Sequence, residues 1–170
     1  MTGGGATLVV MVLGVSATVL PLAVDVPPRI IWNASASVPI GLYAVETASQ
    51  LQLNDLVVVR PPEGVAALLT EGGYLPRGVP LLKHILALPG QTVCRFGSAI
   101  SVDAVAMGDA RGRDGRGRAL PVWQGCRVLD EGEVFLMNRS ADSFDGRYFG
   151  PLPAATIVGR AEPLWIAREE

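Results

Sequence analysis

Two short segments of the chain carry the residue types of a nucleophile and a base. Ser37 lies in NASASVPIGLY, residues 33–43, directly before a valine and a proline. Lys83 opens KHILALPG, residues 83–90, and most of the residues around it are apolar. An amine in apolar surroundings loses solvation, so its pKa falls and its neutral form can accept a proton from a serine hydroxyl. The pair could therefore act as nucleophile and general base without a histidine.

A third segment, SFDGRYFG at residues 143–150, brings a hydroxyl, a carboxylate and a guanidinium close together. Taken singly, each segment has an ordinary structural explanation. Serine, proline and glycine are common in turns, and a lysine stem can pack on a strand while its head reaches water. A local pair between Asp145 and Arg147 could simply close a turn. Only the three segments together indicate a reaction site.

Lys83 is the only lysine, and every other basic residue is an arginine. Arginine stays protonated in proteins, whereas a buried lysine can become neutral. If the chain uses a side-chain amine as a base, that base is Lys83.

The composition predicts one folded domain with many turns. The chain has 170 residues, of which 49% are hydrophobic and 18% charged, which excludes intrinsic disorder. A net charge of −2 excludes a strongly basic nucleic-acid binder. The 20 glycines and 13 prolines favour a β fold over a helical bundle. One histidine and two cysteines cannot form a four-ligand zinc site without carboxylates, so we expect no metal and no other cofactor.

The N-terminus predicts a membrane anchor over residues 1–28. Residues 1–24 carry no charged side chain, and Asp25 and two prolines follow. At about 1.5 Å per residue, the apolar run at residues 6–24 is just long enough to cross a hydrocarbon core of about 30 Å. A cleaved signal peptide and a buried helix are the alternatives. The remaining residues, 29–170, form the domain.

Apolar runs separated by turn residues predict strands at residues 56–59, 81–88, 132–137 and 156–166, and a short helix at 65–70. The fold class is therefore mainly β. A flexible Gly/Arg-rich insertion is expected at about 95–125, with an exposed loop, GDARGRDGRGR, at residues 108–118. A basic patch for lipid headgroups or nucleic acid is the alternative for this loop. Cys94 and Cys126 enclose the insertion and would form a disulfide outside the cytoplasm, or two buried thiols otherwise.

In this order, the three segments resemble the signal peptidase I family of Ser/Lys endopeptidases. The family pattern is a serine shortly before a proline, then K-x-x-x-[GA]-x-P-G, then S-x-D-x-R-Y-[WF]-G, behind an N-terminal anchor. The forms SVPIGLY and SFDGRYFGPLP look most like the conjugative-transfer, TraF-type branch. The resemblance implies an antiparallel β-sheet catalytic domain, in the periplasm, behind one transmembrane helix in the inner membrane.

The resemblance also implies roles for individual residues. Ser37 would be the nucleophile and Lys83 the general base. Ser35 would help the backbone N–H of Ser37 to hold the oxyanion, and Ser143 would orient the lysine amine. Asp145 and Arg147 would form a structural ion pair near the site.

The sequence departs from the family pattern at two places. Gly146 stands where general signal peptidases often have serine, and NRSAD at residues 138–142 replaces a G-D-N type run. These departures weaken the case for housekeeping substrates and leave Ser37 and Lys83 unaffected.

His84 and Asp142 are rival site residues. His84 could be the base of a Ser-His-Asp hydrolase, but consecutive side chains of a strand point to opposite faces, so His84 would face away if Lys83 faces the site. No Gly-x-Ser-x-Gly segment surrounds Ser37. Asp142 could replace Asp145 as the paired carboxylate.

The function implied is that of a monomeric, membrane-bound endopeptidase that cleaves exported precursors or pilin after small residues, as in Ala-x-Ala. Val38 and Leu82 would line the pocket for the residue before the cut. The expected partners are the precursor and the lipid bilayer, and no nucleic acid. The alternatives are a general housekeeping signal peptidase, a self-cleaving repressor-type protease, or a non-catalytic membrane-tethered β domain that binds peptides.

Overall fold

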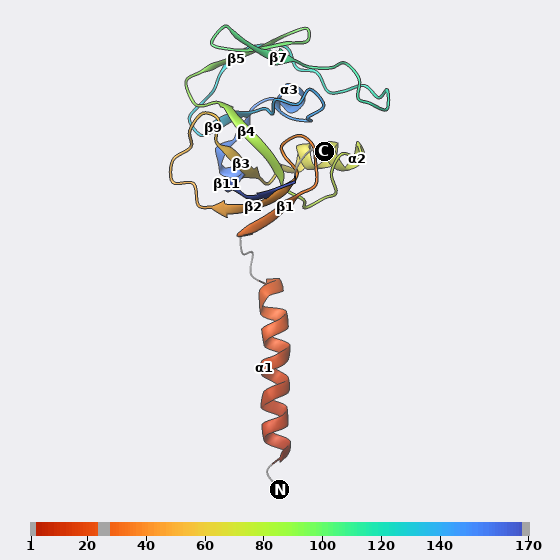
Figure 1. The fold of residues 1–170 in the computed structure, drawn as a ribbon, viewed down its shortest axis with the longest axis vertical. Helices are drawn as coiled ribbons and strands as arrows, with labels where there is room; N and C mark the ends of the chain where they lie inside the picture. Colours follow the sequence, from red (N-terminus) through yellow and green to blue (C-terminus); the bar gives the residue numbers. More distant parts are fainter. Residues whose placement is uncertain (1–2, 24–27, 168–170) are drawn as a thin grey trace.

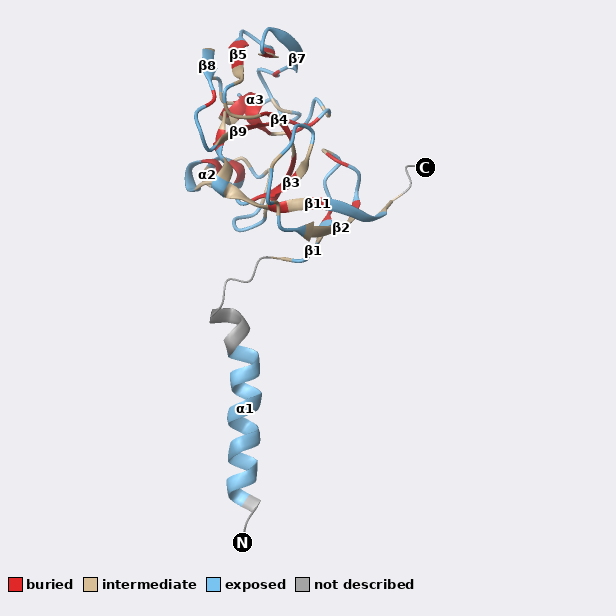
Figure 2. Ribbon diagram, turned by 90° about the vertical axis from the view of Figure 1, so that its left-hand side faces the viewer, coloured by how far each residue is buried: buried red, intermediate tan, exposed pale blue. Residues whose placement is uncertain are grey.

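The computed structural model describes residues 3–23 and 28–167. Helix α1, Gly3–Ala23, extends away from a β domain that contains all the other elements (Figure 1). Its apolar side chains are more than half exposed between Leu8 and Leu13 (Figure 2). Within the described residues, no helix meets the combined length and hydropathy of a membrane span. The anchor at residues 1–28 therefore stays a prediction, and residues 1–2 and 24–27 of it lie outside the described part.

The domain is built on a seven-stranded sheet in the order β1-β2-β11-β3-β4-β9-β10, and its paired strands are antiparallel. The strands are β1 Ile30–Asn33, β2 Gly41–Glu46, β3 Leu56–Val59, β4 Leu81–Ala87, β9 Glu133–Leu136, β10 Leu152–Pro153 and β11 Ile157–Ile166. Val57, Val58 and Val59 of β3 are fully buried, as a continuous apolar run in the middle of a sheet requires. The mainly-β prediction is confirmed.

Helix α2, Glu63–Glu71, packs on this sheet through Val65 and Leu69. These two residues are four positions apart and so lie on one face of the helix. They join a core with side chains from β3, β4 and β9. Two short helical segments adjoin β10 in the sequence: α3, Gly146–Phe149, precedes it, and a 3₁₀ turn, Ala154–Thr156, follows it.

A second sheet of four strands, in the order β7-β6-β5-β8, forms a separate layer at the end of the domain away from α1 (Figure 1). Its strands are β5 Thr92–Phe96, β6 Ala99–Val102, β7 Val105–Asp109 and β8 Gly125–Val128. Val93, Ile100 and Val102 of this sheet share a core with Ala87 and Phe135 of the larger sheet. This shared core fixes the small sheet to the larger one.

Each of the four strands predicted from the sequence is present, with ends that agree within one or two residues. The helix predicted at 65–70 is α2, which is slightly longer. The predicted insertion at about 95–125 contains more regular structure than the sequence indicates, because parts of β5 and β8 and all of β6 and β7 lie in it. The 108–118 segment continues from β7 into a turn, and a β-bridge between Arg113 and Ala119 closes the base of that turn.

Cys94 and Cys126 are joined by a disulfide with an S–S distance of 1.99 Å. They are directly opposite each other in the β5–β8 pair, so the bond ties the two strands that begin and end the insertion.

We expect mass spectrometry of unreduced peptides from native protein to recover Cys94 and Cys126 as one linked species. The double variant Cys94→Ser/Cys126→Ser should lose about 3–4 kcal/mol of unfolding free energy, the chain-entropy value for a loop of this size. Denaturant unfolding of both proteins measures this loss. Two freely alkylated thiols in native protein would contradict the disulfide.

Candidate active site

Lys83 lies in the middle of β4, which pairs with β3 on one side and β9 on the other. Its side chain is 3% exposed, and its Nζ donates a hydrogen bond of 2.7 Å to Ser143 Oγ. Ser143 is also buried and comes from the loop between β9 and α3. The sequence pattern placed these two residues in one site, and the structure brings them into contact.

Burial lowers the pKa of Lys83 from 10.5 to about 8. The charge of Asp145 opposes this change and the charge of Arg147 adds to it, so the two partly cancel. A desolvated amine with a pKa near 8 is partly neutral at mildly alkaline pH, which is the form that can accept a proton.

Asp145 and Arg147 form a fully buried ion pair beside the lysine. Arg147 Nε donates to Asp145 Oδ1 at 2.9 Å and Nη2 donates to Oδ2 at 2.8 Å, which is a two-pronged contact. Arg147 Nη2 also donates to the backbone oxygens of Asn138 and Ser140. The pair therefore fixes the loop that carries Ser143, as the sequence prediction of a structural role requires.

Asn138 holds the backbone of β4 on both sides of Lys83. Its Nδ2 donates to Leu82 O at 3.0 Å, and its Oδ1 accepts from the His84 backbone N–H at 3.0 Å. The Asn138 N–H donates in turn to Asp145 Oδ2 at 3.0 Å. One buried amide thus ties the lysine strand to the ion pair.

Ser37 lies in the loop between β1 and β2, and its Oγ is 3.0 Å from Ser35 Oγ. Asn33 shapes this loop, because its Oδ1 accepts from both the N–H and the Oγ of Ser35. The Asn33 Nδ2 donates to three backbone oxygens, those of Ser35, Val38 and Pro39. Tyr43 adds a 2.6 Å hydrogen bond to Pro39 O. The Ser37 loop is consequently held by buried side chains at its base.

A cavity of about 720 Å³ brings Ser37 and Lys83 together. Ser35 and Ser143 line the same cavity, so the four predicted site residues surround one space. The rest of the lining comes from β1, the end of α2, the segment leading into β4 and the Ser143 loop. These lining residues are Ile31, Trp32, Asn33, Ala34, Ala36, Leu69, Tyr74, Leu75, Val79, Pro80, Leu81, Leu82, Ser140, Asp142 and Phe144. Ser37, the candidate nucleophile, and Lys83, the candidate base, therefore line one cavity.

The rival residues lie elsewhere or have other partners. His84 turns away from Lys83, and its Nδ1 lies 3.1 Å from Asn138 Oδ1. Asp142 is exposed and pairs with Arg111, so the buried carboxylate beside the lysine is that of Asp145.

Leu82 lines the cavity, whereas Val38 packs in the core cluster that contains Leu82 and is not among the lining residues. Among residues 3–23 and 28–167, no group of three His, Cys, Asp or Glu side chains is placed to hold a metal ion.

Sequence reasoning missed the positioning roles of Asn33 and Asn138. Both asparagines are buried, yet single polar residues in a sequence carry no periodic signal that indicates burial. In the sequence, Gly146 stands out only as a departure from the family pattern. A Cβ at Gly146 would lie 2.6 Å from Leu136 O and 2.7 Å from the Phe135 ring, so this backbone contact requires glycine.

The comparisons with known proteins agree on one family. The family model described as signal peptidase, peptidase S26, matches residues 5–166. A conjugal transfer protein TraF from Agrobacterium fabrum (strain C58 / ATCC 33970) is 37% identical over 145 residues, covering 78% of this chain and 80% of that protein. A plasmid transfer protein TraF from Escherichia coli is 32% identical over 143 residues, with the same coverage of 78% and 80%.

A solved signal peptidase I from Enterococcus faecalis V583 aligns with 66% of this chain and 97% of its own, at 17% identity. Its TM-score of 0.40 is too low to add to the argument. The assignment depends on the family model and the sequence relatives, and on these grounds the chain belongs to the signal peptidase S26 family.

Proposed function

We propose that this chain is a membrane-anchored serine endopeptidase that uses Ser37 and Lys83 to cleave exported precursor peptides after small residues. The observation that carries the proposal is the buried Lys83 amine, which has a pKa of about 8 and shares one cavity with Ser37. Ser143 orients this amine through the 2.7 Å hydrogen bond.

The reaction follows from these positions. Ser37 Oγ first exchanges its contact with Ser35 for one with Lys83. Neutral Lys83 then takes the proton of the Ser37 hydroxyl while Ser37 Oγ attacks the scissile carbonyl. The backbone N–H of Ser37 donates to the oxyanion, and so does the hydroxyl of Ser35 once it rotates away from Asn33 Oδ1. The protonated lysine then gives its proton to the leaving amine, and an acyl-enzyme remains. A water molecule, deprotonated by Lys83, hydrolyses that ester and restores both side chains.

The relatives suggest where this reaction takes place. Those named TraF are conjugal or plasmid transfer proteins, so we place this chain in conjugative transfer, with a precursor such as pilin as its substrate. The apolar side chains exposed on α1 and the uncharged residues 1–24 favour an anchor in the inner membrane. The disulfide favours a periplasmic catalytic domain, because such bonds persist in oxidising compartments.

A peptide can bind in extended form between the two walls of the cavity. One wall is β1 with the Ser37 loop, and the other is the segment at residues 79–83. In an extended peptide alternate side chains point the same way, so the residues one and three before the cut face the protein. Leu82 lies at the lysine end of this wall, and we expect its side chain to limit the size of the residue before the cut.

Cleavage of a peptide with an Ala-x-Ala site should stop in Ser37→Ala and in Lys83→Ala, with losses of about a thousandfold or more in kcat/KM. Lys83→Arg should be equally inactive, because arginine keeps its proton at working pH. Ser49→Ala, at an exposed serine outside the cavity, is the matched control and should keep full activity. Normal cleavage by Lys83→Arg would exclude Lys83 as the base. Absence of cleavage by wild type would leave peptide binding without catalysis as the better hypothesis.

Activity should rise with pH and reach half its plateau near pH 8, the pKa of Lys83. The sign follows from the base role, since about a tenth of an amine with this pKa is neutral at pH 7 and about half at pH 8. The measurement is kcat/KM against pH for wild type and His84→Ala. A midpoint near 6.5, the ordinary histidine value, that moves in His84→Ala would point to His84 instead.

A residue larger than alanine or serine immediately before the cut should block cleavage. Steric exclusion by a shallow pocket discriminates more strongly than the roughly 1–3 kcal/mol available from one methylene. Profiling a peptide library with detergent-solubilised protein measures this preference. Efficient cleavage after Phe or Arg would contradict both the shallow pocket and the substrate class.

A further inference from the structure

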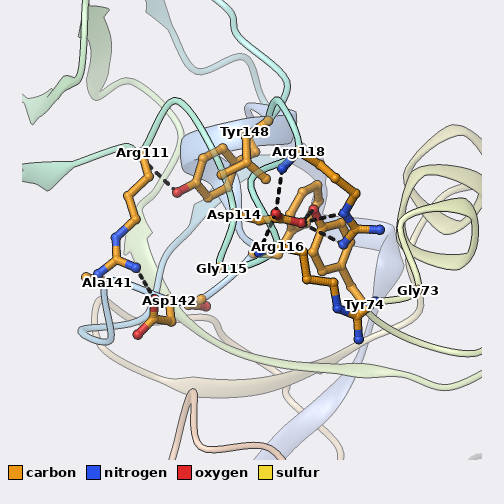
Figure 3. Close-up of a pocket in the computed structure, with 13 residues that line it drawn as sticks. Gly73, Tyr74, Arg111, Asp114, Gly115, Arg116, Arg118, Ala141, Asp142 and Tyr148 are labelled. Atoms are coloured by element: carbon orange, nitrogen blue, oxygen red, sulfur yellow. Dashed lines mark hydrogen bonds and ion pairs between the residues drawn. The ribbon is translucent and has the colours of Figure 1, made fainter.

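A second cavity, of about 430 Å³, adjoins the cavity of Ser37 and Lys83 (Figure 3). Tyr74, Asp142, Ser143 and Phe144 line both spaces. The second cavity is otherwise lined by residues of the Gly/Arg-rich insertion, by Gly73 shortly after α2, by Ala141 and by Tyr148 of α3. A substrate that passes Ser143 in the first cavity can therefore continue into the second.

Asp114 holds the turn of the insertion in a fixed shape. Its Oδ1 accepts from the backbone N–H groups of Arg116 and Arg118, each at 2.9 Å. Its Oδ2 accepts from Arg118 Nε and from Tyr74 OH, each at 2.7 Å. The hydrogen bond from Tyr74 is the largest of the causes that lower the pKa of Asp114, so this carboxylate stays charged. The turn is thus anchored to the wall of the cavity.

Three arginines line this cavity, and two of them form ion pairs with carboxylates. Arg118 pairs with Asp114, and Arg111 pairs with Asp142. Arg116 also lines the cavity, and its Nη1 would lie 3.5 Å from a Cβ placed on Gly73. Within the part of the chain that the structure describes, no carboxylate forms an ion pair with Arg116. The anchored turn consequently presents an unneutralised positive charge at the cavity.

We infer that the second cavity binds a carboxylate of the substrate, on the side after the scissile bond, through Arg116. This inference rests on the proposed function. The wall at residues 79–82, where the segment before the cut binds, lines only the first cavity. The second cavity adjoins the first through Ser143 and its neighbours, at the lysine end of that wall. A peptide that runs along the wall to Ser37 therefore brings its downstream residues to Arg116.

The test uses peptide pairs with one Ala-x-Ala site, in which Glu or the neutral, isosteric Gln occupies one of the first four positions after the bond. Wild type should prefer Glu over Gln by about fivefold in kcat/KM at one of these positions, because a partly exposed ion pair contributes about 1 kcal/mol. The preference should fall with added salt.

The variants separate Arg116 from general charge effects. In Arg116→Gln the Glu-to-Gln ratio should fall to about one, and in Arg116→Glu a Lys at the same position should be preferred. Arg139→Gln removes the same charge from an exposed arginine that lines neither cavity, and it should keep the Glu preference. Binding of labelled peptides to the Ser37→Ala variant, read by fluorescence anisotropy, should show the same ratios without cleavage.

Two results would overturn the inference: equal cleavage and binding of the Glu and Gln peptides, or a Glu preference that survives in Arg116→Gln. Cleavage of the Gln peptides in either of these cases keeps the proposed function intact. A Glu preference in binding without any cleavage would reject the proposed function and retain the carboxylate site.

Discussion

The free energy of desolvating one amine is the constraint on which this structure depends. The fall in the pKa of Lys83 from 10.5 to about 8 corresponds to about 3 kcal/mol of lost preference for the charged form. In the folded state the amine therefore carries a cost at neutral pH that the unfolded chain does not, and the cost disappears above the pKa of free lysine. A central strand is a position at which the amine can be shielded from water to this extent. β4 supplies that position, because β3 and β9 pair with it on either side and apolar residues flank the lysine.

The polar residues around Lys83 keep the amine in place without restoring its charge. Asp145 alone would raise the pKa of the lysine, but the two-pronged contact with Arg147 brings a compensating positive charge to the same spot. Asn138 then fixes the register of β4, which matters because a slip of one residue would turn Lys83 to the opposite face and put His84 in its place. The buried ion pair and the asparagine thus act on Lys83 through geometry.

Much of this arrangement could be predicted from the sequence, because its signals are local. Apolar runs such as those at β3 and β4 predict central strands, and the spacing of Ser37, Lys83 and Ser143 within three motifs predicts the site. The hydrogen bonds of Asn138 to β4 could not be predicted, since they join segments whose distance is set by the folded sheet. Those of Asn33 stay within its own loop, but no periodic signal in the sequence indicates that its side chain is buried. The strands β5 to β8 were missed for a different reason. They are short, and their turns use glycines such as Gly97 and Gly125 with positive φ, so the composition alone is also typical of an irregular loop.

Contacts with α3, which the sequence does not predict, connect the insertion to the candidate site. Arg95 of β5 donates a buried hydrogen bond to Arg147 O, and Trp123 Nε1 donates to Gly146 O at 3.0 Å. Both acceptors belong to α3, whose N-cap is Asp145, so the small sheet is attached to the same residues that hold Ser143. The close approach of Gly146 to β9 leaves α3 little freedom to shift. An insertion attached in this way is tied to the residues that hold Lys83 and Ser143 in place. The turn that carries Arg116 is therefore a fixed part of the wall around the substrate, although its sequence alone is typical of a flexible loop.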